Sequence, residues 1–375
     1  MRIVGFGTYD RDKHPRAGIL LDGMQTLGAT VVELNRPLGF STAERVAMLG
    51  RPLTAHRLVT RLLRCWVGLV VDRTRLRTRP DAVLVGYLGH FDVVLARLLF
   101  PRTVVVLDLL VFGADTAADR GVRRGVRLRL LGALDALAVR CADVVLLDTA
   151  EHADMLAPAV RARGVVVPVG APDSWTGPEP VARPGGPLRV VFYGLFTPLQ
   201  GAPVIGAALA LMAQRGADVR VTMVGDGQDL VETRRLAGDD NPLATWTSWL
   251  DPDELRRLAG EQDVCLGIFA DSGKGLRVIP NKVYQGAAAG CAIVTSDTPP
   301  QRRALGDAAR FVRPGDAAAL ADALGSLAAD PAAVLRLRRA AHDRASSQFT
   351  PPRVAEVALE AVGAALARQR IPQHR

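Results

Sequence analysis

Short runs of hydrophobic residues alternate with amphipathic segments along most of the chain. In the first half the hydrophobic runs are RIVGFG, TVVELN, DAVLVGY, RTVVVLDLLV, ADVVLLDT and GVVVPVG. Continuous Val- and Leu-rich runs are typical of strands buried on both faces of a parallel sheet. Segments between them, such as RAGILLDGMQTLGA, have the hydrophobic spacing of helices. Repeated strand–helix alternation predicts a doubly wound α/β domain.

A break in this pattern at residues 168–187 divides the chain. The segment PVGAPDSWTGPEPVARPGGP is rich in Pro and Gly and has no periodicity, as in an interdomain linker. The alternation then resumes, with strands predicted at LRVVFYG, DVRVTMVGDG, near ATWTSW, and at DVCLGIF, CAIVTSD and ARFVRPGD. We predict two Rossmann-like doubly wound α/β domains, residues 1–178 and 188–350, facing a central cleft, and a helix at 351–375 that packs back on the first domain.

Composition and charge narrow the class of protein. The chain has 375 residues, of which 49% are hydrophobic and 23% charged, as expected for a globular protein of two domains. The net charge is +9, and most of the excess falls in residues 1–180. This excess of positive charge favours an anionic partner, namely lipid, nucleic acid or a phosphorylated substrate. The alternative is that the arginines lie on solvent-exposed faces and bind no partner. No zinc finger, helix-turn-helix or aromatic RNA-binding pattern occurs, which argues against nucleic acid.

The cysteines and the N-terminal residues indicate in which cellular compartment the protein is expected. Four cysteines are widely spaced in apolar stretches, which predicts buried free thiols and no metal site: Cys65, Cys141, Cys265 and Cys291. The N-terminal stretch lacks the apolar length of a signal peptide, and no run of about 20 apolar residues predicts a membrane span. We expect a cytoplasmic protein, with peripheral contact to the inner face of an anionic membrane as an open alternative.

The stretch SGKGLRVIPNKVYQGAAAG, residues 272–290, holds two of the three lysines in the chain. Pro280 and Asn281 can open a helix that carries Lys282 in its first turn and ends at Gly290.

Three cations lie near the start of this predicted helix: Lys274, Arg277 and Lys282. Cations and a helix N-terminus together suit a diphosphate. Gln285, one turn after Lys282, could bond ribose hydroxyls. The alternative is a solvated basic loop followed by an ordinary core helix.

Glycine-rich turns follow two of the predicted strands of the second domain. Gly194 and Gly201 flank one strand-to-helix turn, and Gly225 and Asp226 end another strand. Such turns let backbone N–H groups approach an anion. They also occur as ordinary tight turns without a ligand.

The order of these motifs over roughly residues 188–368 resembles the nucleotide-sugar-binding half of retaining glycosyltransferases with two Rossmann domains, the GT-B architecture of the group-1/family-4 class. The first half, with MRIVGFGTYDRDKHPR and the junction VVVPVGAPDSW, is similar more loosely. The resemblance implies a nucleoside-diphosphate-sugar donor, transfer with retention, and no metal or cofactor. Protein cations and backbone amides would then stabilise the leaving diphosphate.

The chain departs from the pattern of that class at three positions. Gln200 stands where the class usually has lysine, and Arg277 and Gln285 stand where it usually has two glutamates. We hypothesise that Lys274, Arg277 and Lys282 replace the missing diphosphate cations. The donor site that the resemblance implies also includes Gly7, Gly194, Thr197, Gly201, Gly225, Asp226, Trp249, Leu250 and Asn281. For Trp249 the alternative is core packing.

The first domain is expected to bind the acceptor. His90 follows a predicted strand and, by the resemblance, contacts the transferred sugar, so His90 and Arg277 are the candidate catalytic residues. A purely structural histidine is the alternative. The candidate acceptor-binding residues are Tyr9, Arg16 and Asp108; Asp108, Asp115 and Asp119 lie along one predicted loop region and could also be caps or surface charges.

Residues 56–79 and 119–140 combine arginines with apolar residues at helical spacing. Both segments could lie on an anionic membrane surface. The alternative is a solvated helix face that covers the core.

The resemblance implies a retaining, metal-independent glycosyltransferase that uses a nucleotide sugar, and the two predicted α/β domains are consistent with it. The acceptor would be a glycan, a lipid-linked intermediate or a natural product. Two alternatives remain: an epimerase or phosphorylase of the same fold, and a non-catalytic nucleotide-sugar-binding protein.

Overall fold

The computed structural model describes residues 1–11, 14–39, 52–122, 125–183 and 185–370. Contacts group the chain into two units. Unit 1 takes its residues from 1–114, 123–167 and 351–375, and unit 2 from 115–122 and 168–350. The linker predicted at 168–187 thus groups with unit 2, and so does the short segment 115–122.

Unit 1 is built on a parallel sheet with the strand order β2-β1-β3-β4-β5-β6. The strands are β1 (Arg2–Gly7), β2 (Thr30–Asn35), β3 (Ala82–Val85), β4 (Val104–Asp108), β5 (Val144–Leu147) and β6 (Gly164–Val166). The helices are α1 (Arg16–Thr26), α3 (Pro52–Thr74), α4 (Asp92–Leu99), α6 (Val126–Cys141), α7 (Ala150–Asp154), the 3-10 helix η1 (Pro158–Arg163) and α15 (Pro351–Arg370). Helix α5 (Gly113–Asp119) starts in unit 1, and its residues from Asp115 on group with unit 2.

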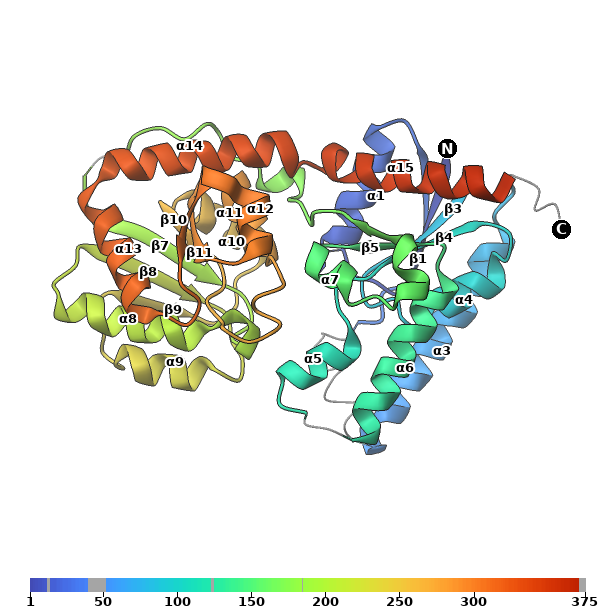
Figure 1. The fold of residues 1–375 in the computed structure, drawn as a ribbon, viewed down its shortest axis with the longest axis horizontal. Coiled ribbons are helices and arrows are strands. Elements are labelled where there is room, and N and C mark those ends of the chain that lie inside the picture. Colours follow the sequence, from blue (N-terminus) through green and yellow to red (C-terminus); the bar gives the residue numbers. More distant parts are fainter. Residues whose placement is uncertain (12–13, 40–51, 123–124, 184, 371–375) are drawn as a thin grey trace. The chain divides into compact units, whose positions relative to one another are not determined.

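Both faces of this sheet are covered by helices. One hydrophobic cluster joins alternate strand residues to α1 and α15, which lie side by side in Figure 1. A second cluster on the other face joins the remaining strand residues to α3, α4 and α6. Burial on both faces explains why the strands read as continuous hydrophobic runs.

Unit 2 repeats this design with the strand order β12-β11-β10-β7-β8-β9, all parallel. The strands are β7 (Leu188–Tyr193), β8 (Val219–Val224), β9 (Ala244–Thr247), β10 (Val264–Leu266), β11 (Ala292–Ser296) and β12 (Ala309–Val312). The helices are α8 (Ala202–Gln214), α9 (Leu230–Ala237), α10 (Pro252–Gly260), α11 (Asn281–Ala288), α12 (Pro299–Leu305), α13 (Ala317–Ala329) and α14 (Pro331–Gln348), with 3-10 turns η2 (Asp173–Trp175), η3 (Pro198–Gln200) and η4 (Gly306–Ala308). The predicted α/β class with two doubly wound domains is confirmed.

Several local predictions can be compared with the structure. Asp251 and Glu254 form a capping box at the start of α10, as the Asp and Glu three residues apart in the sequence favour. Helix α11 begins after Pro280, and Gly290 follows it with a positive φ of 80°. The cysteines are free, but Cys141 is only half-buried, which corrects the prediction of four buried thiols.

The region of Asp115 and Asp119, predicted as a loop, is the helix α5. The physical reason lies in α6, because Asp135 accepts hydrogen bonds from the Gly113 and Ala114 N–H groups at 2.9 and 3.1 Å. A carboxylate at this place satisfies donors that a helix N-terminus leaves unpaired.

Among the described residues, no single helix is long and apolar enough to cross a membrane. Only the bent pair Ala317–Ala329 and Pro331–Gln369 passes such a test of length and composition when its two parts are taken together.

Candidate functional site

The predicted donor-binding residues of unit 2 gather at one edge of its sheet. Gly194 follows β7, Gly225 follows β8, and Trp249 lies just after β9. Helix α11, with Lys282, comes after the central strand β10. Because all these strands are parallel, their carboxyl ends meet at this edge, where α/β sheets bind ligands.

The loops after β7 and β8 are held against each other by their backbones. Phe196 donates its N–H to the Asp226 carbonyl at 2.9 Å, and Asp229 donates back to the Phe196 carbonyl at 3.0 Å. A Cβ on Gly225 would stand 2.0 Å from the Gly194 carbonyl oxygen. Glycine is therefore required at position 225 for this close approach.

Gly201 closes the loop after β7 at the start of α8. Its φ is 62°, and a Cβ there would lie 2.3 Å from the backbone nitrogen of Ala270. The preceding carbonyl, that of Gln200, accepts a hydrogen bond from the Phe269 N–H at 3.0 Å. Gln200 is thus fixed just before a helix N-terminus, where backbone N–H groups favour an anion.

Lys282 reaches this loop from the first turn of α11. Its ammonium Nζ donates to the Gln200 side-chain Oε1 at 2.6 Å and stands 3.6 Å from the centre of the Phe192 ring. The side chain is 4% exposed, and this burial lowers the pKa of Lys282 to about 7, opposed in part by the Cys265 thiol. Within the described part of the chain, no carboxylate forms an ion pair with this ammonium. Because a buried charge is stable only with a partner, the arrangement favours an anionic ligand at this point.

The other two predicted cations have partners in the segment 115–122. Lys274 Nζ donates to Thr116 Oγ1 at 2.8 Å, and an Arg277 guanidinium nitrogen lies 2.5 Å from Asp115 Oδ1. The predicted group of three cations therefore engages two different sets of partners, and Lys282 is the one bonded to Gln200. Asp115 was singled out from the sequence, but Phe192, Thr116 and the pairing of Asp115 with Arg277 were not, since these contacts join residues distant along the chain.

The remaining donor candidates differ in exposure. Gln285 is half-buried and its Oε1 lies 3.4 Å from the Tyr193 hydroxyl, which donates to it. Asp226 is exposed and accepts from the Gly227 N–H. Trp249 is 64% exposed, so the alternative of core packing is wrong. Three further candidates are half-buried: Thr197, Leu250 and Asn281.

In unit 1, His90 lies between β3 and α4 and is buried. Its ring nitrogen Nε2 is 3.0 Å from Asp135 Oδ1, the carboxylate that also caps α5. Asp135 was not predicted as a site residue. A sequence signal for it is absent because 45 positions separate the two residues along the chain.

Gly7, the last residue of β1, packs against the carboxylate of Asp92. A Cβ on Gly7, whose φ is 141°, would lie 3.0 Å from Asp92 Oδ2. Asp92 accepts from the Thr8 N–H and hydroxyl at 2.8 Å each, and from Trp66 Nε1 at 2.8 Å. Gly7 is thus needed for a tight internal packing at the end of this strand.

The three candidate acceptor residues are all buried. Arg16 and Asp108 are each 1% exposed and form an ion pair, with Arg16 Nε 2.7 Å from Asp108 Oδ1. Arg16 also donates to the Val167 carbonyl at 3.0 Å. Burial raises the pKa of Asp108, and Arg16 opposes that shift. Tyr9 donates its hydroxyl to Glu33 at 2.7 Å, and burial raises its pKa. In this arrangement the three side chains stabilise unit 1 from within and do not reach solvent.

No group of three or more His, Cys, Asp or Glu side chains that could hold a metal ion occurs among the residues the structure describes.

Comparison with known families identifies the second unit. Residues 187–330 match the family model of the glycosyl transferases group 1. This segment is a group 1 glycosyltransferase domain. The predicted enzyme class, a glycosyltransferase, is thereby confirmed, and the match contains β7 to β12 with every loop of the edge described above.

Solved structures match nearly the whole chain. Sucrose-phosphate synthase from Thermosynechococcus elongatus has a TM-score of 0.71 and 16% identity, over 98% of this chain and 100% of that one. HepE from Anabaena, solved with UDP-glucose, has a TM-score of 0.64 and 14% identity over 97% and 99%. A glycosyltransferase from Rickettsia africae has a TM-score of 0.64 and 11% identity, over 97% of this chain and 98% of that one. At these low identities the matches establish the GT-B fold alone. No curated protein sequence shows significant similarity to the chain.

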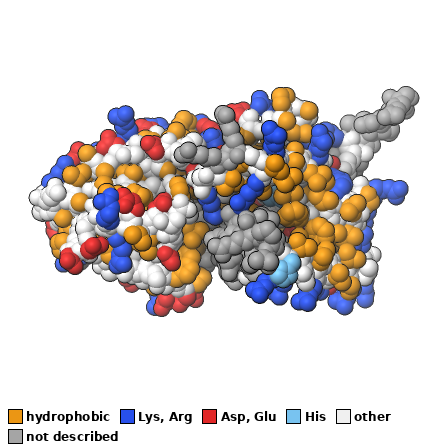
Figure 2. Space-filling model, turned by 90° about the horizontal axis from the view of Figure 1, so that it is seen from below, with side chains coloured by type: hydrophobic (Ala, Val, Ile, Leu, Met, Phe, Trp, Pro, Cys, Tyr) orange, Lys and Arg blue, Asp and Glu red, His pale blue; other side chains and the backbone are white. Residues whose placement is uncertain are grey.

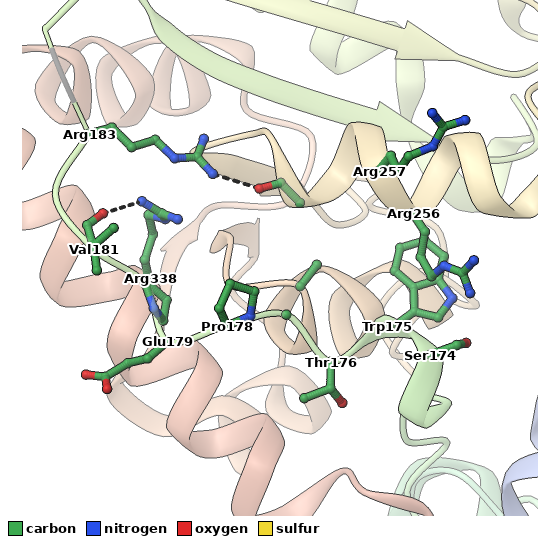
Figure 3. Close-up of a pocket in the computed structure, with 14 residues that line it drawn as sticks. Ser174, Trp175, Thr176, Pro178, Glu179, Val181, Arg183, Arg256, Arg257 and Arg338 are labelled. Atoms are coloured by element: carbon green, nitrogen blue, oxygen red, sulfur yellow. Dashed lines mark hydrogen bonds between the residues drawn. The ribbon is translucent and has the colours of Figure 1, made fainter.

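A groove of about 310 Å3 in the glycosyltransferase unit lies against the linker (Figure 3), and none of the donor candidates is among the residues that line it. Arg338 of α14 donates to the Gly290 and Val181 carbonyls at 2.8 and 3.0 Å. Arg183 of the linker donates to the Gly260 carbonyl at 2.7 Å and to Asp263 at 3.1 Å. These bonds fasten the linker to α10 and α14, which gives both arginines a structural role.

Proposed function

We propose that the protein transfers a sugar from a nucleoside diphosphate sugar to an acceptor hydroxyl, with retention at the sugar carbon and without a metal ion. The observation that carries the proposal is the buried Lys282 ammonium, bonded to Gln200 at the start of α8. A cation at this place neutralises the diphosphate that leaves the sugar. Preorganised charge where negative charge develops is a large term in enzymatic rate enhancement.

The chemistry assigns roles to several residues. Backbone N–H groups at the start of α8 and the Lys282 ammonium bind the diphosphate oxygens. Gln285, beside Tyr193, faces the ribose hydroxyls. In unit 2, Arg277 pairs with Asp115 and is proposed to act on the transferred sugar. In unit 1, His90, whose Nε2 lies 3.0 Å from Asp135 Oδ1, is the other proposed catalytic residue.

A protein of the same fold indicates which donors to examine first. HepE, which shares the fold, was solved in complex with UDP-glucose, so uridine diphosphate sugars are the first donors to examine. The acceptor is proposed to be a glycan, a lipid-linked intermediate or a natural product. Free cysteines are typical of a reducing compartment, which supports a reaction in the cytoplasm.

A screen of nucleoside diphosphates and their sugars by thermal shift tests donor binding, because a ligand of the folded state raises the melting temperature. We expect at least one nucleoside diphosphate to raise it, and His90→Ala to leave that shift intact while lowering turnover. A screen in which no nucleotide raises the melting temperature would contradict the proposal.

Product analysis separates the remaining alternatives. A transferase releases the nucleoside diphosphate at a rate that EDTA does not change, and the anomeric configuration of the product matches that of the donor. Inversion of the product or loss of activity in EDTA would contradict the mechanism. Dependence on inorganic phosphate would indicate a phosphorylase, and binding without any release would indicate a non-catalytic protein.

A further inference from the structure

Helix α3 of unit 1 has two apolar stripes, and only one of them faces the core. The inner stripe is buried or half-buried: Leu58, Leu62, Cys65, Trp66 and Leu69. The outer stripe repeats every three or four residues and is exposed by 39% to 66%: Val59, Leu63, Val67, Val70 and Val71. A helix on a globular protein normally turns polar residues to solvent on that side.

Two neighbouring helices extend this exposed apolar face. Helix α4 contacts both α3 and α6, and its Leu98 is 72% exposed. Helix α6 exposes three more aliphatic side chains: Val126 (72%), Leu130 (64%) and Leu137 (47%). Of the 19 exposed large hydrophobic residues in the described part of the chain, nine lie on these three helices. Such a concentration indicates an interaction surface.

Up to Val71, the charged side chains of α3 beside this face are all positive, and the first carboxylate of the helix, Asp72, pairs with Arg36. Arg57, Arg61 and Arg64 are exposed and follow each other at helical spacing next to the outer stripe. From residue 56 to residue 71 the sequence has no Asp or Glu. In Figure 2, hydrophobic side chains gather on unit 1 with Lys and Arg side chains beside them.

Aliphatic side chains with a row of guanidinium groups fit one partner best. Leu and Val enter the boundary between headgroups and acyl chains, and arginines bind the phosphates of anionic lipids. We propose that the surface formed by α3, α4 and α6, here called the docking face, binds unit 1 peripherally to a bilayer rich in anionic lipid. The inference rests on unit 1 alone and is independent of the proposed donor site in unit 2.

Vesicle flotation of the full chain tests the proposal at low salt. The probe is a vesicle of phosphatidylcholine with about one third phosphatidylglycerol, compared with pure phosphatidylcholine. We expect the protein to float with the anionic vesicles only. The triple variant R57Q/R61Q/R64Q should bind roughly 100-fold more weakly, since each arginine near an anionic surface contributes about fivefold. The variant L63E/V67E should not float with either.

A matched control separates the docking face from exposed apolar residues in general. Val231 of α9 in unit 2 is 79% exposed, and V231E should float like the wild type. Because all the changed side chains are exposed, we expect every variant to fold. Circular dichroism melting checks this.

Two results would overturn the proposal. The first is absence of flotation with anionic vesicles at low salt. The second is a wild-type dimer in solution that L63E/V67E converts to a monomer while vesicle binding is unchanged, because the docking face would then be an interface between two copies of the chain.

Discussion

The Lys282 ammonium donates a hydrogen bond to the Gln200 side chain at 2.6 Å, although 82 positions separate the two residues. Gln200 occupies the loop position where glycosyltransferases with this pattern usually carry lysine. Under the proposed function, the Lys282 ammonium takes over the role of that lysine. It comes from the first turn of α11 instead of the loop after β7, and it supplies the positive charge that a leaving diphosphate requires.

The first prediction concerns protons taken up when a nucleotide binds. Burial lowers the pKa of Lys282 to about 7, so at pH 8 the neutral amine predominates in the free enzyme. A bound diphosphate favours the charged form and raises that pKa. Calorimetric titration with a nucleoside diphosphate at pH 8, in buffers of different ionisation enthalpy, should therefore show net proton uptake of up to about one proton. Lys282→Met should abolish the uptake, and equal uptake by the variant would contradict the assignment.

The same pKa shift predicts how stability depends on pH without a ligand. Between about 7 and 10.5 the unfolded chain binds more protons at this lysine than the folded one. The free energy of unfolding should therefore rise with pH across this window relative to Lys282→Met. Urea titrations at several pH values measure the difference, and a difference that falls with pH would contradict the shift.

The second prediction compares two glycines with the same backbone. Gly201 and Gly216 have φ values of 62° and 63°, but only Gly201 approaches another backbone, at 2.3 Å from Ala270 N for an added Cβ. Gly216→Ala should cost about 1–2 kcal/mol for the left-handed conformation alone. Gly201→Ala should cost clearly more, because the backbone at 269–270 cannot move away without breaking its hydrogen bonds. Equal costs in urea unfolding would show that close approach does not matter here.

The third prediction distinguishes an internal role from an acceptor-binding role for Arg16 and Asp108. Removing one partner of this buried pair leaves an uncompensated charge and should cost about 3–5 kcal/mol, as for Arg16→Met. The double variant R16M/D108L should recover much of that loss. A full thermodynamic cycle by denaturant unfolding measures the coupling. Stable single variants with altered acceptor KM would instead support the acceptor role.

Much of the fold follows from the sequence because the central strands of both sheets are buried on both faces and therefore form continuous hydrophobic runs. The capping box of α10 and the start of α11 also follow, since Asp251, Glu254 and Pro280 act on their own neighbours in the chain. Interactions between residues only a few positions apart can be recognised in the sequence itself.

The contacts of the candidate site required the structure. The sequence suggests that basic residues near α11 replace a missing lysine, but it does not say which one bonds to Gln200. Arg277 binds Asp115 instead, a carboxylate 162 positions away. Arg16 and Asp108 were expected to face an acceptor, yet they pair with each other in the core, although 92 positions separate them along the chain.

The central claim is that a single cation, wherever it is anchored, binds the donor diphosphate beside Gln200. The most direct measurement is the dissociation constant of a nucleoside diphosphate for four proteins: wild type, Lys282→Gln, Gln200→Lys, and the double variant Q200K/K282Q. Loss of one charge-assisted hydrogen bond should weaken binding of Lys282→Gln roughly 10- to 100-fold. The double variant returns the cation to the loop and should restore most of the affinity. If Lys282→Gln binds like the wild type, or if the double variant binds no better than Lys282→Gln, the claim is wrong.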